Sequence, residues 1–419
     1  MVDPPDIEQN LFPAALWGVD LPDLHAPIAP RPLLATHEQF SPDFLKAASE
    51  VRARYELFGV PEKFEIASAD DPHAMTMKLR LATVDWFSRW FLGRKGPERE
   101  LDLTLEPREQ LYCTPTGLVR NSHQGDTLLL RIAKKQARLP PPGTAPARQP
   151  EIAAFRADAV AQIPRLLRFQ KSDGPLGVRE IVTTPRHGYR IEKIEFLSEP
   201  GIYLPAWVFV PEAVQDRVSI LYVGDRGVNS DGVEFGPIEG LVKQGRIVTA
   251  VDVRGIGETK PPHLDVSGRN EFRHVDSVET AMTYMAWEMN ESLFGMRVRD
   301  VVRSVDYILS RPDVDRGKVR VVGSGRGALW VLFATALDAR IQETVCEQGL
   351  LSYRTLTGTD RYTHGADIFI PSILEHFDLP QVAATIVPRR LSVVAPVDAM
   401  KRPTEETAAK RAYDWTRQV

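Results

Sequence analysis

The chain is poor in cysteine and has no long apolar run. Two cysteines, Cys113 and Cys346, occur in 419 residues, too few for a disulfide framework or a cysteine-based zinc site. We expect both to be small buried hydrophobic side chains. No apolar run approaches the roughly 18 to 20 residues of a membrane span. The N-terminus, M-V-D-P-P-D-I-E-Q-N, lacks the basic and apolar regions of a signal peptide, and the compartment stays open.

An excess of charge of either sign is also missing. The formal net charge is −4, which gives no reason to expect nucleic acid or an anionic membrane as a partner. The length predicts roughly two to three domains with ample hydrophobic core.

A passage near the N-terminus recurs near the C-terminus. Residues 13–34 read P-A-A-L-W-G-V-D-L-P-D-L-H-A-P-I-A-P-R-P-L-L, and residues 371–392 read P-S-I-L-E-H-F-D-L-P-Q-V-A-A-T-I-V-P-R-R-L-S. Without a gap, the identical residues of the first copy are Pro13, Leu16, Asp20, Leu21, Pro22, Ala26, Ile28, Pro30, Arg31 and Leu33. A repeat at so long a period predicts two domains of one kind. If the passage falls late in its domain, the chain holds the end of one domain and most of another.

The first 93 residues alternate between strand and helix patterns. We predict a strand at Pro32–Thr36, a helix at Phe44–Phe58 and a second strand at Phe64–Ala67. A loop with His73 and an aromatic-rich helix, Leu79–Leu92, follow. This order is typical of an α/β fold with parallel strands.

Residues 94–150 are predicted to be a linker. L-Y-C-T-P-T-G-L-V (111–119) and D-T-L-L-L-R-I (126–132) favour short strands or a hairpin. The proline-rich stretch 138–150 is predicted to be an extended, semi-rigid spacer.

A second α/β domain is predicted at residues 151–419. It begins with a helix at 152–169, and a long amphipathic helix is expected at 296–309. Strands are expected at 190–196, 204–210, 218–223, 247–253, 318–322, 343–346 and 390–395, with a helix at 328–337 after the fifth.

A strand, a glycine-rich turn and a helix at 318–337 have the form of a nucleophile elbow, G-x-S-x-G. The five turn residues are Gly323, Ser324, Gly325, Arg326 and Gly327. Gly325 holds the nucleophile position and has no hydroxyl for a base to activate. Ser324 stands one residue early, and we interpret it as a small polar turn residue; a displaced nucleophile is the alternative.

Other parts of this domain's site are also altered. Asp398 follows the last strand, where the acid of a Ser-His-Asp set often lies, but no histidine follows it. After residues 221–223, where an oxyanion loop is expected, the chain has Gly224-Asp225-Arg226. A carboxylate there opposes a developing oxyanion. The second domain is therefore predicted to be catalytically silent, with a degenerate elbow at Ser324 and Gly325.

The N-terminal segment carries a candidate base and acid. His73 lies in D-D-P-H-A between the second strand and the last helix, and Glu38 follows the preceding strand. A carboxylate in that place accepts a hydrogen bond from the imidazole and fixes its tautomer. The alternatives are an ordinary loop histidine and a solvated loop acid.

Together these passages resemble the α/β-hydrolase superfamily, in particular acetyl-xylan-esterase-like and prolyl-oligopeptidase-like tandem carboxylesterases. The resemblance implies a mostly parallel sheet flanked by helices, preceded at residues 1–93 by the C-terminal part of another hydrolase domain. It implies two-step hydrolysis of a small acyl ester or acylated polysaccharide, with His73 and Glu38 in the active site and the serine upstream of residue 1. It implies no cofactor and no metal, and relatives of full length are expected to be exported.

Three hypotheses follow. The chain is the C-terminal portion of a tandem carboxylesterase, with little activity as it stands. Alternatively, it is a non-catalytic pseudohydrolase that acts as a structural, interaction or carbohydrate-binding module. In the third, residues 60–92 dock on the second domain and bring His73 toward Gly325. Because residues 1–92 have apolar faces suited to a larger sheet, Trp86, Phe87, Trp90 and Phe91 are predicted to form an exposed patch. The segment should then associate with its missing half or with another copy.

Overall fold

The computed structural model describes residues 13–37, 42–71, 74–100, 102, 104–123, 125–139, 146, 148–215, 217–261, 278–359 and 361–419. The chain divides into two compact units. Unit 1 comprises residues 1–125 with 264–276 and 287–290, and unit 2 comprises 126–263, 277–286 and 291–419. Each unit is described below by itself.

Unit 1 is a small α/β unit. Its elements are α1 (Leu21–His25), β1 (Leu33–His37), α2 (Pro42–Leu57), β2 (Phe64–Ser68), α3 (Met77–Leu92) and α4 (Val119–Ser122). The strands β1 and β2 pair in parallel from Leu33↔Phe64 to His37↔Ser68, which confirms the predicted strand, helix, strand and helix. The fully buried Tyr55 packs with Phe64 in the small core and donates a hydrogen bond to the Arg31 carbonyl at 2.7 Å.

The sequence repeat is also a repeat of local structure. Asp20 caps α1, and Asp378 caps α13 (Leu379–Ala384). In both copies the aspartate side chain accepts a hydrogen bond from the next backbone N–H, and a side chain three residues on accepts from the aspartate N–H. This reciprocal capping box fixes the helix start. In both copies the chain then enters a parallel strand, β1 or β10 (Arg390–Val394).

The strands predicted at 111–119 and 126–132 are wrong. The described residues form a 3-10 turn at Arg108–Leu111, the short helix α4, and the helix α5 (Leu128–Arg138). The Thr127 hydroxyl accepts the Leu130 N–H at 3.2 Å and so caps α5. The apolar side chains at 128, 129, 130 and 132 fit either a strand or a helix, because the run is short. The Thr127 cap and the Arg and Lys residues that follow favour the helix.

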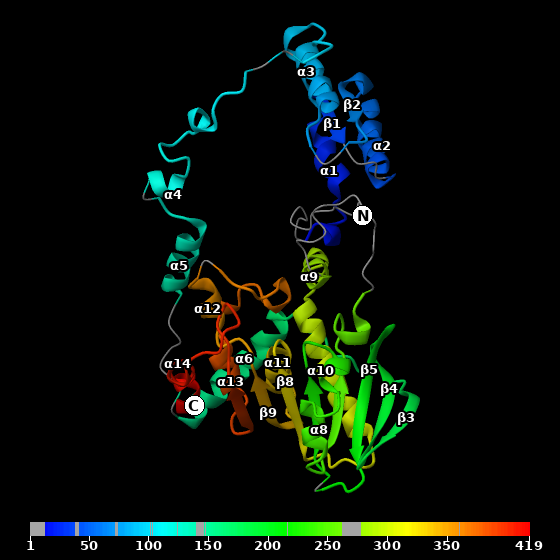
Figure 1. Ribbon diagram of the computed structural model, residues 1–419, viewed down its shortest axis with the longest axis vertical. Coiled ribbons are helices and arrows are strands. Elements are labelled where there is room, and N and C mark those ends of the chain that lie inside the picture. The colour runs from blue at the N-terminus through cyan, green and yellow to red at the C-terminus, as the bar shows by residue number, and fades with distance from the viewer. Residues whose placement is uncertain are drawn as a thin grey trace. The chain divides into compact units, whose positions relative to one another are not determined.

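Unit 2 is built on an eight-stranded, mostly parallel sheet (Figure 1). The strand order is β10-β9-β8-β6-β7-β5-β4-β3. The strands β6 to β10 are parallel, and β5, β4 and β3 extend the sheet in antiparallel fashion. All seven predicted strands are confirmed; β3 is additional. Their bounds are β3 Arg179–Arg186, β4 Tyr189–Glu199, β5 Ile202–Pro211, β6 Ser219–Val223, β7 Ile247–Val251, β8 Val319–Ser324 and β9 Ile341–Glu347.

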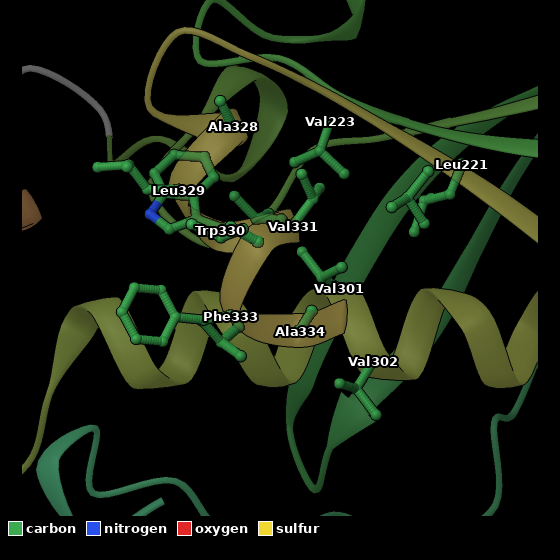
Figure 2. Packing of buried hydrophobic residues seen from close by; sticks show 14 of the residues in the cluster. Leu221, Val223, Val301, Val302, Ala328, Leu329, Trp330, Val331, Phe333 and Ala334 are labelled. Carbon is green, nitrogen blue, oxygen red and sulfur yellow. The ribbon is translucent and has the colours of Figure 1, made fainter. Parts of the chain in front are cut away.

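Helices cover both faces of this sheet. One face packs against α6, α10, α11 and α13, and Figure 2 shows Val301 and Val302 of α10 beside Trp330 and Phe333 of α11. The other face packs against Ile238 and Val242 of α8. The helices of unit 2 not yet given bounds are α6 Gln149–Leu166, α7 Val228–Asp231, α8 Pro237–Val242, α9 Val278–Glu288 (ending in unit 1), α10 Leu293–Ser310, α11 Gly327–Leu337, α12 Tyr353–Thr357, α14 Glu406–Ala412 and α15 Asp414–Gln418. Within the described residues, no helix is long and apolar enough to cross a membrane.

Two side-chain predictions need correction. Cys346 is buried as expected, and its thiol donates to the Ala328 carbonyl at 3.4 Å, but Cys113 is exposed. Burial raises the pKa of the Cys346 thiol to about 12. In α3, Phe87 and Phe91 are exposed and stacked, whereas Trp86 is buried at 5% exposure. The helix turns Trp86 toward the interior of unit 1, so the exposed patch is smaller than predicted.

Candidate active-site pocket

The turn between β8 and α11 has the backbone of a nucleophile elbow. The strand ends at Ser324, Gly325 has a φ of 61°, and α11 begins at Gly327. The Gly325 N–H donates to the Glu347 carbonyl at 2.9 Å and ties the turn to β9. Glycine adopts this left-handed conformation without the strain that a side chain adds.

The flanking glycines allow β8, β6 and α11 to approach closely. A Cβ on Gly327 would lie 2.0 Å from the Val223 carbonyl oxygen, and one on Gly323 would lie 2.5 Å from the Gly327 carbonyl oxygen. Both distances are far below contact distance, so packing alone requires glycine at these positions. The two outer glycines of the motif therefore carry no information about catalysis.

The carboxylate of Asp225 occupies the place of the nucleophile side chain. A Cβ built on Gly325 would lie 2.5 to 2.7 Å from the three carboxylate atoms of Asp225. The Arg326 N–H donates to Asp225 Oδ2 at 3.2 Å. In an acyl-transfer elbow, the N–H after the nucleophile is an oxyanion-hole donor. Here that donor is already bonded to a carboxylate of the chain itself.

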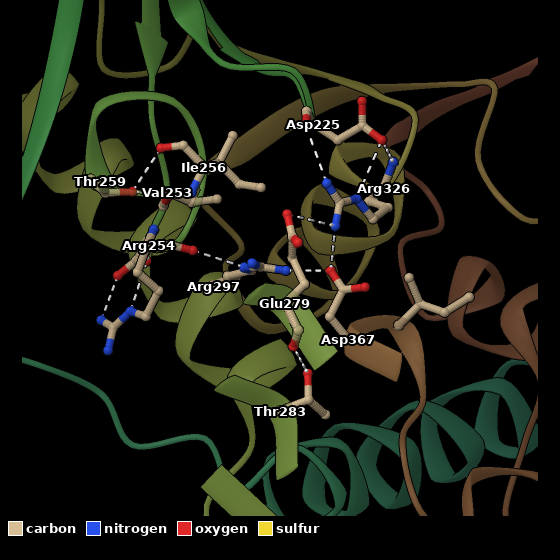
Figure 3. A network of polar contacts seen from close by, with 12 residues as sticks. Asp225, Val253, Arg254, Ile256, Thr259, Glu279, Thr283, Arg297, Arg326 and Asp367 are labelled. Atoms are coloured by element: carbon tan, nitrogen blue, oxygen red, sulfur yellow. Dashed lines mark hydrogen bonds and ion pairs between the residues drawn. The ribbon is translucent and has the colours of Figure 1, made fainter. Parts of the chain in front are cut away.

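A buried ionic network holds the Arg326 side chain, as Figure 3 shows. Its guanidinium donates to Asp367 Oδ2 at 2.8 Å and lies 3.7 Å from Glu279. Asp367 also pairs with Arg297 at 2.5 Å, and both of these side chains are fully buried. Burial lowers the pKa of Arg297, an effect that the neighbouring Asp367 charge opposes. Arg326 is therefore held by carboxylates from several segments of unit 2.

The Ser324 side chain does not take part in the network around Arg326. Its hydroxyl is hydrogen-bonded with the Tyr222 hydroxyl, which also lies 3.4 Å from Asp231 Oδ2. Burial raises the pKa of Tyr222, so the phenol stays protonated and cannot accept a proton from serine. Within the described ranges, no histidine is hydrogen-bonded to Ser324.

Asp398 is bonded within its own loop. Its Oδ1 accepts from the N–H groups of Met400 and Arg402 at 2.8 and 2.9 Å. The nearby histidine is His364, whose Nε2 donates to the Asp398 backbone carbonyl at 2.9 Å rather than to the carboxylate. Burial lowers the pKa of His364, which keeps the imidazole neutral at pH 7.

A pocket of about 510 Å³ lies at the elbow of unit 2. Its wall contains Asp225, Arg226, Ser324, Gly325, Arg326, Leu329, Gln348, Leu350, His364, Ala395, Val397, Lys401 and Pro403. Asp398 is not among these lining residues, and its backbone carbonyl accepts hydrogen bonds from His364 Nε2 and from the Lys401 N–H, two residues that line the pocket.

His73 and Glu38 lie outside the described residues. The strands that precede them end side by side, since His37 of β1 pairs with Ser68 of β2. The assignment of the two residues as base and acid stays a prediction.

Sequence reasoning missed His364, Gln348 and Lys401. They lie in the loops after β9 and β10, and the pairing of β9 with β8 and β10 brings these loops toward the elbow. Only the rule that sites form at the carboxyl ends of parallel strands could have singled out these loops.

The strand order, the antiparallel β5 and the elbow between β8 and α11 define an α/β-hydrolase fold. Residues 181–364 match the family "Acetyl xylan esterase (AXE1)", which agrees with the sequence resemblance. The matched part is less than half of the chain.

One solved structure shares the fold, and one curated protein matches a shorter stretch of the sequence. A "putative acetyl xylan esterase" from Bacteroides fragilis has a similar fold, with a TM-score of 0.55, 17% identity, and coverage of 70% of this chain and 81% of that chain. The "Putative hydrolase YtaP" of Bacillus subtilis is 30% identical over 110 residues, which are 26% of this chain. The match spans 37% of the length of that relative.

Proposed function

We propose that the protein is part of a carboxylic ester hydrolase of the acetyl xylan esterase type, in which unit 2 is a non-catalytic hydrolase module. The observation that carries the proposal is the carboxylate of Asp225 at the elbow, within 2.7 Å of where a nucleophile's Cβ would lie. A serine hydrolase needs a hydroxyl at this point and a free N–H beside it. Unit 2 offers neither.

Electrostatics support the same proposal. Removal of one oxyanion-hole donor costs a hydrolase roughly 100- to 1,000-fold in kcat. In unit 2 the Arg326 N–H is bonded to an anion, and that anion would also repel the negative charge of a tetrahedral intermediate. Ser324, bonded to a protonated tyrosine, has no base within the described residues.

Residues 1–93, in unit 1, are proposed to be the C-terminal part of the first hydrolase domain of a tandem protein. Their β1, α2, β2 and α3 follow the repeated passage in the order that ends such a domain. His73 would move the proton between a serine and the leaving group, and Glu38 would fix the imidazole tautomer. The substrate would be a small acyl ester or an acylated polysaccharide, in keeping with the family matched by unit 2.

An ester-hydrolysis assay of the whole chain tests the non-catalytic role of unit 2. Purified 1–419 is incubated with an aryl acetate and with acetylated xylan, and product release is compared with that of the Ser324→Ala variant. We expect both proteins to match the buffer rate within error. A rate that is well above background and is lost in Ser324→Ala would refute the proposal.

A further inference from the structure

The pocket of unit 2 has two chemically different ends. At the elbow lies Asp225, whose side chain is 26% exposed and whose Oδ1 has no hydrogen-bond donor among the described residues. At the other end lies Lys401, an exposed residue that has no ion-pair partner among the described residues. The other two cations of the wall are compensated, since Arg226 pairs with Asp231 at 2.5 Å and Arg326 pairs with Asp367 at 2.8 Å. Lys401 is therefore the wall's uncompensated cation.

Hydrogen-bond acceptors gather at the elbow end. His364 lies at the other end, since its Nε2 and the Lys401 N–H both donate to the Asp398 carbonyl. Asp225 is an acceptor only, whereas Ser324 and Gln348 can donate or accept. A ligand that fills this end must bring several hydrogen-bond donors, and it cannot place a negative charge beside Asp225.

We propose that this pocket binds a small hydroxylated carboxylate, with its carboxylate at Lys401 and its hydroxyls toward Asp225. The inference rests on the proposed function, because a pocket that performs no hydrolysis can retain such a ligand. A volume of about 510 Å³ falls in the usual range for small-ligand sites. A simple fatty acid lacks the donors that the elbow end requires, and a neutral sugar leaves the Lys401 charge uncompensated.

Calorimetric titration of intact 1–419 with three probes tests the proposal. Gluconate has both a carboxylate and several hydroxyls, glucose has only hydroxyls, and propionate has only a carboxylate. We expect gluconate to bind with a Kd of about 1 mM or tighter, at least about tenfold more tightly than either other probe, since a hydrogen bond to a charged group is worth roughly 1.5 to 3 kcal/mol.

Two variants assign the ends of the pocket. Lys401→Asn keeps a residue that tolerates the φ of 60° at this position and should weaken gluconate about tenfold. Lys171→Asn, at an exposed lysine that does not line the pocket, is the matched control and should bind as the wild type. Asp225→Asn should weaken gluconate and leave propionate unchanged or improved. Thermal unfolding of each variant establishes that it is folded.

Gluconate binding no tighter than glucose and propionate, or full binding by folded Lys401→Asn, overturns the proposal. These results leave the non-catalytic role of unit 2 intact. Ester turnover that depends on Ser324 would refute the non-catalytic role alone, so the two claims fail separately.

Discussion

At the scale of residues, one missing side chain and one displaced carboxylate change the chemistry of the elbow. Gly325 leaves a gap where an α/β-hydrolase has its nucleophile, and Asp225 fills that gap from the loop after β6. The same carboxylate accepts the Arg326 N–H at the start of α11, an end of a helix that favours negative charge. The Arg326 N–H therefore stabilises the turn by bonding Asp225. In an active hydrolase, the N–H at this position would instead stabilise the oxyanion of the transition state.

The clash at Gly325 predicts an unusually costly substitution. Gly325→Ala should lower the free energy of unfolding by about 1 to 2 kcal/mol for the left-handed backbone, and by about 1 to 3 kcal/mol more for displacing Asp225. Gly201→Ala is the control, since Gly201 has a φ of 80° and no atom within 4 Å of its Cβ position. Denaturant unfolding of both variants gives the comparison.

The extra loss should largely disappear when Gly325→Ala is combined with Asp225→Gly. Equal losses in Gly325→Ala and Gly201→Ala would mean that the carboxylate does not fill the nucleophile's place.

His364 predicts a pH dependence of stability. Burial lowers its pKa in the folded state, so the unfolded chain, with an ordinary histidine pKa of about 6.5, binds the proton more readily. The stabilising effect of the neutral buried ring is therefore complete above about pH 6.5 and is lost as the pH falls toward the folded-state pKa. As the pH falls from about 8 to 5, the free energy of unfolding should decrease more steeply for the wild type than for His364→Gln. Parallel curves for the two proteins would contradict this prediction.

At the scale of elements, α11 is held against the sheet by close backbone approach. Gly327 lets the first turn of α11 lie against β6, and Trp330 and Phe333 then pack into the core beside α10. This packing fixes the turn whether or not the turn carries a nucleophile. Packing would therefore require the outer glycines even in an elbow that is not catalytic.

Alanine substitution separates the roles of two helical glycines. Gly327→Ala places a Cβ 2.0 Å from a backbone carbonyl and should destabilise unit 2 by about 3 kcal/mol or more. Gly240→Ala, in α8 with no atom within 4 Å of the added Cβ, should be neutral or stabilising by up to about 1 kcal/mol. Thermal or denaturant unfolding measures both, and a mild effect of Gly327→Ala would contradict the packing described for α11.

The sequence predicted most elements because their apolar periodicity is strong. The buried strands β6 and β7 and the amphipathic helix α10 are clear in the pattern of residues alone. The edge strand β3 escaped prediction because nearly all of its side chains are exposed, which leaves no apolar face to recognise. The elbow could be located from its glycines, whereas the position of the Asp225 carboxylate depends on how the loop after β6 folds back.

At the scale of the whole molecule, the chain combines two units that share one local motif. Both contain the capped helix that leads into a parallel strand, but α3 in unit 1 leaves Phe87 and Phe91 exposed as a stacked pair. Exposed aromatic patches of this kind mark association surfaces. If unit 1 is part of a hydrolase domain, as proposed, this surface would bind the rest of that domain or another copy.

The exposed pair predicts concentration-dependent association. Sedimentation velocity of 1–419 should reveal species larger than a monomer that diminish in a Phe87→Ser, Phe91→Ser variant, because burial of each ring contributes roughly 1.5 to 3 kcal/mol. Tyr203→Ser, at an exposed aromatic residue of unit 2, is the control. A wild type that stays monomeric at all concentrations would argue against this surface.

The most direct test of the central claim, that unit 2 has the elbow of a hydrolase without its chemistry, is labelling with a serine-directed fluorophosphonate. Intact-protein mass spectrometry of 1–419 after labelling should show no adduct, because Ser324 is bonded to a protonated tyrosine and the Arg326 N–H is bonded to Asp225. A stoichiometric adduct mapped to Ser324 would show an activated serine and contradict the account.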